Sequence, residues 1–182
     1  MRIVGGRHRG RKLIGPSDRR IRPTSDRARE ALFDLLEHRT PALRGARFLD
    51  LCAGTGAVGL EAYARGAAEV VLVENDPAAL HLIRRNRALL GDPPAVRVLA
   101  ADAARLPATI RAFDLVFLDP PYDAGSAGPI LRGLQGGRLA GGALVIAEIR
   151  GRGTLARPAG FDLIEERRYG AARFVFLRPA EG

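Results

Sequence analysis

The stretch from Phe48 to Gly59 constrains the fold more than any other, because it reads as a buried strand, a glycine-rich turn and the start of a helix. Its glycines, Gly54, Gly56 and Gly59, stand at the G-x-G-x-x-G spacing. Glycine allows a tight turn, a close approach of the backbone to a ligand and close packing of the helix. The pattern predicts a loop that holds a nucleotide-containing cofactor, with a plain strand-to-helix turn as the alternative.

Short apolar runs alternate with helical patterns from residue 47 onward. Strands are expected at 47–51, 69–74, 95–100, 113–118 and 143–148, and helices at 56–65, 77–90 and 127–135. This alternation predicts an α/β fold with a mostly parallel, doubly wound sheet. Residues 161–168 and 172–178 are two further strand-like runs, and the turn between them is too short for a helix. They should therefore pair antiparallel.

The first 47 residues carry most of the net positive charge. They hold 13 Arg and Lys against 5 Asp and Glu, whereas residues 48–182 hold 16 against 15. A basic segment on a nearly neutral body is typical of proteins that bind nucleic-acid phosphates, although a solvated arginine-rich arm would show the same bias. The candidate RNA-binding residues are Arg7, Arg9, Arg11, Lys12, Arg22 and Arg27.

Two local structures are expected in this basic segment. Two short apolar pieces within residues 1–15, joined by glycines and basic residues, predict a small hairpin with the basic side chains near its tip. Thr24 or Ser25 is a candidate N-cap for an amphipathic helix of about four turns. Pro41 and Gly45 are expected to end that helix.

The length and the cysteine content exclude several classes of protein. A chain of 182 residues fits one domain, here 1–182, with a basic N-terminal extension at 1–45 and a cofactor-binding core at 46–182. Cys52 is the only cysteine, so neither a disulfide framework nor a Cys/His zinc site is expected. No apolar run is long enough for a membrane helix, and no secretory signal follows the basic N-terminus. We expect a cytoplasmic, monomeric protein without a metal.

Acidic residues follow three of the predicted strands. Glu74 ends a strand 20 residues after Gly54, where a carboxylate can accept hydrogen bonds from ribose hydroxyls, or lie at the surface with no ligand. Asp50 precedes the glycine turn, near the polar end of a cofactor, and can also cap that turn. Asp102 is placed to accept from an adenine amino group, or to cap the turn that follows it.

The sequence Asp119-Pro120-Pro121-Tyr122 follows the predicted strand 113–118 and reaches the same sheet edge as the glycine turn. The prolines stop the strand and fix a rigid set of backbone carbonyls. The Asp119 carboxylate and the Pro120 carbonyl can each accept one N–H of a nucleobase amino group, and Tyr122 can stack on a base that has left its own stack. An Asp-Pro-Pro turn with a chance tyrosine is the alternative.

These motifs resemble those of a known family. Asp-Pro-Pro-Tyr is similar to the (Asp/Asn)-Pro-Pro-(Tyr/Phe) motif of S-adenosylmethionine-dependent amino-methyltransferases. The basic opening, Arg-Pro-Thr-Ser-Asp-Arg-Ala-Arg-Glu-Ala-Leu-Phe at 22–33 and Asp-Leu-Cys-Ala-Gly-Thr-Gly at 50–56 resemble the bacterial small-subunit (16S) ribosomal RNA guanine-N2 methyltransferases. The resemblance covers nearly the whole chain, and residues 22–33 are its most family-specific part.

The resemblance implies the Rossmann-like, seven-stranded class I methyltransferase sheet and methylation of one guanine N2 on 16S ribosomal RNA, in a small subunit or an assembly intermediate. It implies S-adenosylmethionine as cofactor and S-adenosylhomocysteine as product. The cofactor-binding residues would be Asp50, Cys52, Ala53, Gly54, Gly56, Glu74, Asn75, Asp102 and Ala103, and Asp119, Pro120, Pro121 and Tyr122 would act on the target base. Cys52 departs from the Phe expected in many relatives.

Three alternatives stay open at the level of sequence. The same acceptor motif suits a methyltransferase acting on adenine N6 or on a glutamine amide, and the basic segment disfavours the glutamine substrate. An NAD-dependent oxidoreductase would explain the glycines and Glu74, but it leaves Asp-Pro-Pro-Tyr without a role. A non-catalytic nucleic-acid-binding module would leave both the cofactor motif and the acceptor motif without a role.

Overall fold

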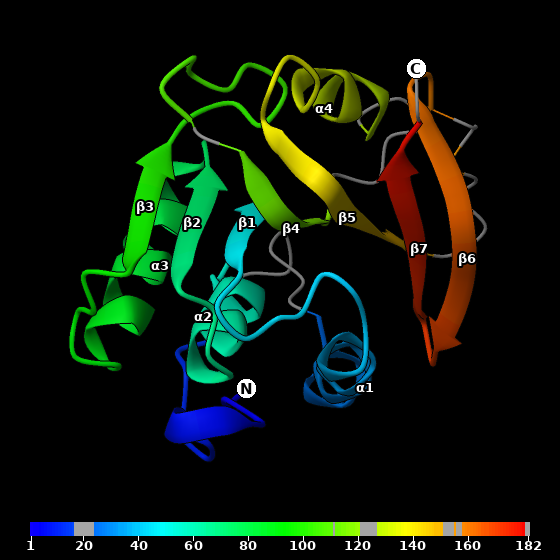
Figure 1. The fold of residues 1–182 in the computed structure, drawn as a ribbon. Coiled ribbons are helices and arrows are strands. Elements are labelled where there is room, and N and C mark those ends of the chain that lie inside the picture. Colours follow the sequence, from blue (N-terminus) through cyan, green and yellow to red (C-terminus); the bar gives the residue numbers. More distant parts are fainter. Residues whose placement is uncertain (17–23, 111, 121–126, 151–154, 156–157, 181–182) are drawn as a thin grey trace.

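Seven strands form one twisted sheet in the computed structural model, which describes residues 1–16, 24–110, 112–120, 127–150, 155 and 158–180 (Figure 1). The strands are β1 (Arg47–Leu51), β2 (Glu69–Glu74), β3 (Val96–Ala100), β4 (Phe113–Leu118), β5 (Leu139–Arg150), β6 (Phe161–Tyr169) and β7 (Ala172–Pro179). Their order is β3-β2-β1-β4-β5-β7-β6. Strands β1 to β5 are parallel, and β7 pairs antiparallel with both β5 and β6. The predicted mostly parallel sheet with an antiparallel C-terminal hairpin is confirmed.

The sheet order reverses beside β1. The chain runs from β1 outward to β2 and β3, and then returns to place β4 on the other side of β1. In parallel α/β sheets, ligands bind at the carboxyl ends of the strands at such a switch point. The carboxyl ends of β1 and β4 are therefore the place where the fold itself creates a crevice.

Helices cover both faces of the sheet (Figure 1). The helices are α1 (Asp26–Glu37), α2 (Ala57–Ala64), α3 (Pro77–Ala88) and α4 (Ala127–Gly133), with a short 3-10 helix, η1 (Gly6–His8). Side chains alternate along each strand, so Phe48 and Phe117 belong to one core cluster with α1 and α2, while Leu49 and Leu118 belong to a second cluster with α4. Among the described residues, no helix is both long and apolar enough to cross a membrane.

The N-terminal segment forms the small antiparallel hairpin that its sequence predicts. Arg2 pairs with Lys12, the Ile3 N–H donates to the Arg11 carbonyl at 2.9 Å, and the short helix η1 lies between the two paired pieces. Gly6 has a φ of +66°, and a Cβ there would lie 2.0 Å from the carbonyl oxygen of Ala64. The loop is thus shaped by its contact with the end of α2, a long-range constraint that local sequence does not reveal.

Helix α1 and strand β5 differ in length from their predictions. Helix α1 has 12 residues and ends at Glu37, before the expected stop at Pro41. The residue before a proline is disfavoured in helical conformation, and the chain turns after His38 and reaches Thr40 in a non-helical form. Strand β5 extends to 12 residues because its second half also pairs with β7.

Candidate active site and nucleic-acid interface

A pocket lies at the switch point, where the turn after β1 meets the end of β4. Its lining includes Thr24, Asp50, Cys52, Gly54, Phe117 and Asp119. It encloses about 30 Å³, which is room for one or two groups of the size of a water molecule. Only a few atoms of a larger ligand therefore fit inside the pocket.

The glycine-rich turn has the backbone that its sequence predicts. Gly54 and Gly56 have φ values of +56° and +75°, a region that favours glycine, and Gly56 is the N-cap of α2. A Cβ on Gly59 would lie 2.2 Å from Cδ2 of Leu72, so the absence of a side chain lets α2 pack directly on β2. The three glycines therefore have different roles. Gly54 adopts the positive φ of the turn, Gly56 is the N-cap of α2, and Gly59 lets α2 pack closely on β2.

Asp50 of β1 stabilises this turn through a hydrogen bond to the start of α2. Its side chain is 1% exposed, and its Oδ2 accepts the Gly59 N–H at 2.8 Å. Burial raises the pKa of Asp50 to about 7, the Glu74 carboxylate acts in the same direction, and the Gly59 hydrogen bond opposes both. Asp50 thus combines the predicted turn cap with a position on the pocket wall.

Glu74 binds backbone amides at the end of β2. Its Oε2 accepts the Gly54 N–H at 2.9 Å, and its Oε1 accepts the N–H groups of Asn75 at 2.8 Å and Asp76 at 3.0 Å. A carboxylate has about four acceptor positions, so capacity remains for a further donor. Glu74 is half-buried and Asn75 exposed, and their predicted contacts with a cofactor stay predictions.

Asp102 and Ala103 lie on the loop after β3. The exposed Asp102 accepts the Ala104 N–H at 2.8 Å through Oδ1, so it caps the local turn, which was the alternative role considered for it. Ala103 is buried in the core cluster beneath α4. The second carboxylate oxygen of Asp102 remains as an acceptor, and the adenine contact stays a prediction.

Cys52 and Ala53 form the start of the turn. Cys52 has a φ of +59°, an uncommon value for a residue with a side chain, and the Ala53 N–H donates to the carbonyl of Val73 at 3.0 Å. Burial, followed by the carboxylates of Glu74 and Asp119, raises the pKa of Cys52 to about 12. The thiol therefore stays protonated near neutral pH and is suited to packing, not to nucleophilic attack.

Asp119 and Pro120 follow β4 and are half-buried. The Asp119 N–H donates to the carbonyl of Leu51 at 3.4 Å, which ties the end of β4 to the end of β1. Asp119 and Asp50 line the same pocket from these two strands. The other members of the predicted acceptor motif, Pro121 and Tyr122, lie outside the described residues, so the structure places only the first half of the motif.

Sequence reasoning missed the pocket residue Thr24 and its buried partner Glu148. The Thr24 hydroxyl donates to Oε2 of Glu148 at 2.5 Å, and both side chains are buried. Thr24 was considered only as a helix cap, a role that Ser25 takes by accepting the Ala28 N–H. Glu148 had a detectable signal, because it is an acidic residue directly after the apolar run 143–147, as Glu74 is after its own strand.

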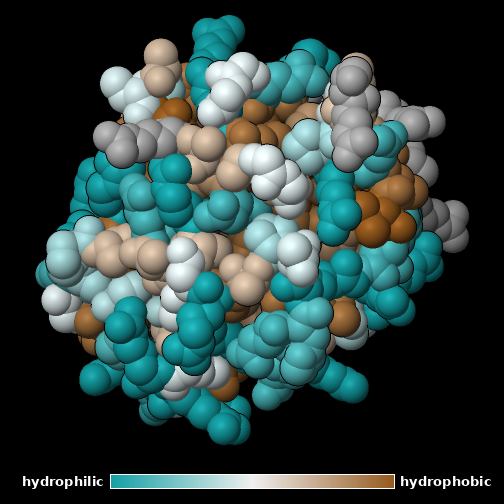
Figure 2. All heavy atoms as spheres, in the orientation of Figure 1, coloured by the Kyte–Doolittle hydropathy of each residue, from teal (hydrophilic) through white to brown (hydrophobic). Residues whose placement is uncertain are grey.

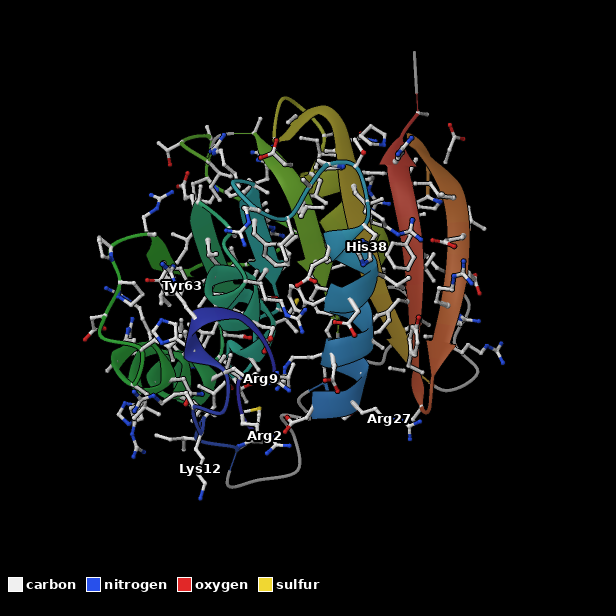
Figure 3. All side chains as sticks on the ribbon, turned by 60° about the horizontal axis from the view of Figure 1, so that its bottom comes forward. Arg2, Arg9, Lys12, Arg27, His38 and Tyr63 are labelled. Carbon is white, nitrogen blue, oxygen red and sulfur yellow. The ribbon has the colours of Figure 1, made fainter. Side chains whose placement is uncertain are left out.

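The basic N-terminal segment is a second candidate site. Arg7, Arg9, Arg11 and Lys12 are exposed, and together they line a groove of about 590 Å³. Figure 3 shows Arg9 and Lys12 on the outside of the molecule and Tyr63 beside the same loop. The segment lies in the lower part of Figure 1, where hydrophilic residues dominate the surface in Figure 2. The structure thus gathers four of the predicted RNA-binding residues on one surface.

Two aromatic contacts stabilise this surface. The Arg7 guanidinium lies 3.8 Å from the centre of the Tyr63 ring, and the His8 ring stacks on Tyr63 with 5.8 Å between centroids. Partial burial, then the charges of Arg7 and Arg11, lower the pKa of His8. The positive charge of the loop near neutral pH therefore comes from its Arg and Lys side chains and not from the histidine.

The basic segment is fixed to the core, and it is not a free arm over residues 1–16. The N–H groups of Val4 and Gly5 donate to the two carboxylate oxygens of Glu61 at 2.8 and 2.7 Å. Further along, Asn86 accepts the Ile14 N–H at 2.7 Å and donates to the Ile14 carbonyl at 3.1 Å. Both anchoring residues, Glu61 and Asn86, are 0% exposed, and no sequence pattern indicates either role.

The remaining predicted RNA-binding residues are placed differently. Arg27 is exposed on α1, in a second groove together with Arg2, Arg9 and Glu30. Arg22 lies outside the described residues. Within the described part of the chain, no group of three or more His, Cys, Asp or Glu side chains is arranged to hold a metal ion.

Comparisons with known proteins agree with this geometry. Residues 1–178 match the family model described as Conserved hypothetical protein 95. Ribosomal RNA small subunit methyltransferase D of Escherichia coli strain K12 is 36% identical over 185 residues, which cover 100% of this chain and 92% of that protein. The protein of the same name from Haemophilus influenzae is 30% identical over 179 residues, covering 96% and 91%. A solved structure of the Escherichia coli protein yhhF is 36% identical with a TM-score of 0.82, covering 98% of this chain and 97% of that chain.

Proposed function

This chain belongs to the family described as Conserved hypothetical protein 95, and from that premise we propose that it methylates the exocyclic N2 amino group of a guanine in small-subunit ribosomal RNA, with S-adenosylmethionine as the methyl donor. The fold is the class I methyltransferase sheet, as expected, and the chain is an enzyme of the rRNA methyltransferase type. The observation that carries the proposal is the pocket in which the glycine-rich turn after β1 meets Asp119 after β4.

The residues around the turn fit a cofactor of the S-adenosylmethionine type. Gly54 and Gly56 keep the backbone free of side chains where the turn faces the switch point, and the half-buried Glu74 carboxylate at the end of β2 has acceptor capacity left for ribose hydroxyls. Asp50 lines the pocket with a pKa of about 7, and a sulfonium cation beside it would favour the ionised form of its carboxyl group. When bound, the cofactor supplies an electrophilic methyl group, and S-adenosylhomocysteine is the product that remains.

Asp119 and Pro120 would position the amino group. The guanine N2 lone pair is delocalised into the ring, so the free amine is a poor nucleophile. A carboxylate and a carbonyl that each accept one N–H hold the nitrogen in place and favour its pyramidal form. The contribution of the protein is then positioning of the two reacting groups, and the amine loses its proton after transfer. Asp119 needs no strong basicity for this role.

The basic surface of residues 7–12 supports RNA as the substrate. Its four exposed cations form a fixed array, because Glu61 and Asn86 hold the segment on either side of them. A prearranged array binds the phosphate backbone without the entropy cost of ordering a free arm. RNA in a small subunit or an assembly intermediate, bound by a monomer of this chain, is the form of substrate that we propose.

The test is to incubate the protein with labelled S-adenosylmethionine and small ribosomal subunits from cells that lack this modification, and then to map the modified nucleotide. N2-methylguanosine at one site of 16S ribosomal RNA is the expected product. Label found as N6-methyladenosine, in DNA or on a protein glutamine would identify one of the alternative amino-methyltransferases. Titration with S-adenosylhomocysteine and with NAD separates the methyltransferase from an oxidoreductase.

Asp119→Ala tests the assignment of the acceptor. The variant should lose nearly all methylation, on the order of 100-fold or more in kcat, because it lacks the carboxylate that orients the amine. Its affinity for S-adenosylhomocysteine, measured by calorimetry, should change little. Normal turnover in the variant would remove Asp119 from the catalytic role.

A further inference from the structure

We infer that Thr24, positioned by Glu148, accepts the N1–H of the target base and thereby makes the pocket specific for guanine. The inference rests on the proposed function and adds the residue that selects the base. Neither the glycine-rich turn nor Asp119 distinguishes guanine from adenine, because both bases offer a planar exocyclic amino group. The structure points to a second acceptor beside Asp119, and that acceptor is Thr24.

Three acidic side chains lie on one face of the sheet at the carboxyl ends of neighbouring strands. Leu118 of β4 pairs with Ala147 of β5, so Asp119 and Glu148 are the next residues on adjacent strands. The two-residue period of a strand places Asp50, Asp119 and Glu148 on the face that α1 covers. Thr24, directly before α1, lies over this row and lines the pocket with Asp50 and Asp119.

The direction of one hydrogen bond decides what Thr24 can offer. Its hydroxyl donates to Oε2 of Glu148 at 2.5 Å, and Glu148 is 2% exposed on β5. A hydroxyl has one hydrogen and two lone pairs, so this donation leaves Thr24 only acceptor capacity for the pocket. A buried carboxylate behind the hydroxyl also increases the negative charge on its oxygen. Thr24 therefore presents an acceptor to whatever enters.

The backbone of Thr24 is held as firmly as its side chain. The fully buried guanidinium of Arg29 donates to the Thr24 carbonyl at 2.8 Å, and through its other amino group to the Arg2 carbonyl and to Asp26. Thr24 is thus fixed between α1 on one side and β5 on the other. This rigidity is what a hydrogen-bond acceptor needs in order to discriminate between bases.

The base edges differ at the position next to the amino group. Guanine carries two neighbouring donors, N2–H and N1–H, whereas adenine carries the N6 amino group beside N1, which is an acceptor. Asp119 and Thr24 together form an acceptor pair that matches two neighbouring donors. With adenine, the N1 lone pair would face the lone pairs of Thr24, and a site built for a donor rejects a base that lacks it.

The experiment compares two target bases in the same RNA. Small subunits are reconstituted with either guanine or 2-aminopurine at the mapped position, because 2-aminopurine keeps the N2 amino group and lacks the N1–H. The ratio of kcat/KM for the two substrates is measured for the wild type, Thr24→Val and Thr24→Ser. This ratio is independent of the fraction of enzyme that is folded, so a destabilised variant still gives an answer.

Thr24→Val removes the hydroxyl with little change in shape, and it should lower kcat/KM for guanine on the order of 10- to 100-fold. On 2-aminopurine, which has no N1–H to bind Thr24, kcat/KM should change little. The ratio of the two values therefore falls by about 10- to 100-fold, and the preference for guanine disappears. Thr24→Ser keeps the hydroxyl and should keep the preference. If Thr24→Val leaves the ratio of kcat/KM for the two substrates unchanged, the inference is overturned, while the N2-methyltransferase assignment stands.

Glu148→Gln tests the positioning role of Glu148. The Gln amide offers both an oxygen and N–H donors, so the Thr24 hydroxyl is no longer fixed as the donor and its hydrogen can turn to the pocket. The guanine preference should fall several-fold, and adding Thr24→Val to this variant should lower it little further. A purely structural role for Glu148 would lower the melting temperature and leave the substrate ratio unchanged. If the wild type methylates adenine, the proposed function itself fails.

Discussion

Replacing Glu61 by Ala should release the basic N-terminal segment from the core. Glu61 is 0% exposed on α2, and its two oxygens accept the N–H groups of Val4 and Gly5 at 2.8 and 2.7 Å. It also pairs with Arg65 at 3.0 Å. The substitution leaves two backbone donors without their partner and opens a gap between the loop and the helix.

The expected cost follows from these contacts. Hydrogen bonds to a charged acceptor contribute about 1.5–3 kcal/mol each. Arg65 keeps Asp34 at 3.1 Å and Glu37 at 2.8 Å, so its charge stays paired and adds little. We therefore expect the free energy of unfolding to fall by about 3–5 kcal/mol, a large part of the stability of a domain of this size.

Urea unfolding of the wild type, Glu61→Ala and Glu61→Gln measures this cost. The Gln variant keeps one good acceptor and should lose about half as much. Glu37→Gln is the matched control, because it removes an exposed partner of the same Arg65 and should cost less than about 1 kcal/mol. Hydrogen exchange at the amides of Val4 and Gly5 should accelerate in Glu61→Ala, and RNA affinity should fall.

The reasoning is refuted if Glu61→Ala costs no more than Glu37→Gln and the amides of Val4 and Gly5 stay protected. That result would mean that other contacts, such as those of Asn86, hold the segment by themselves. Faster exchange of these amides with an unchanged RNA affinity would contradict the argument that a fixed array of cations favours RNA binding.

Three further outcomes are expected. Replacing Arg7, Arg9 and Arg11 by Gln should weaken RNA binding and reduce the slope of log K against log salt by roughly 0.7–0.9 per lost phosphate contact; an unchanged slope would show that these residues do not contact phosphate. Gly59→Ala should lower the free energy of unfolding by about 1–3 kcal/mol, since the new Cβ would lie 2.2 Å from a core Leu side chain. Asp50, whose pKa is raised from 3.8 to about 7, contributes stability that is present below about pH 4 and lost as the pH rises through about 7. The difference in unfolding free energy between the wild type and Asp50→Asn should therefore shift against the wild type by about 4 kcal/mol over this range, and a pH-independent difference would contradict the raised pKa.

Local patterns predicted the strands well where burial repeats along the chain. Phe113–Leu118 was found with its predicted bounds, because a buried parallel strand needs a continuous apolar run and few other structures do. The small hairpin at the N-terminus was also found, but the way it is anchored could not be predicted. The N–H groups of Val4 and Gly5 bind Glu61 of α2, and no local pattern connects residues so far apart in the chain.

In the candidate site as well, the sequence predicted some residues, whereas their contacts depended on the tertiary structure. Asp50, Gly54, Glu74 and Asp119 could be found from the sequence, because polar residues and glycines at the ends of apolar runs reach the same edge of a parallel sheet. What Glu74 contacts could not be found in this way, since its spacing from Gly54 suits both a ribose and the backbone amides that it actually binds.

The sequence by itself determined the class of fold and the residues that stand at the ends of β1, β2 and β4, because periodicity and turn chemistry are local properties. Only the tertiary structure decided that Thr24, from before α1, meets Glu148 of β5 beside Asp119. It likewise decided that Glu61 and Asn86 hold the basic segment. These contacts join residues far apart in the chain, and no pattern along the sequence records which buried polar groups will satisfy one another.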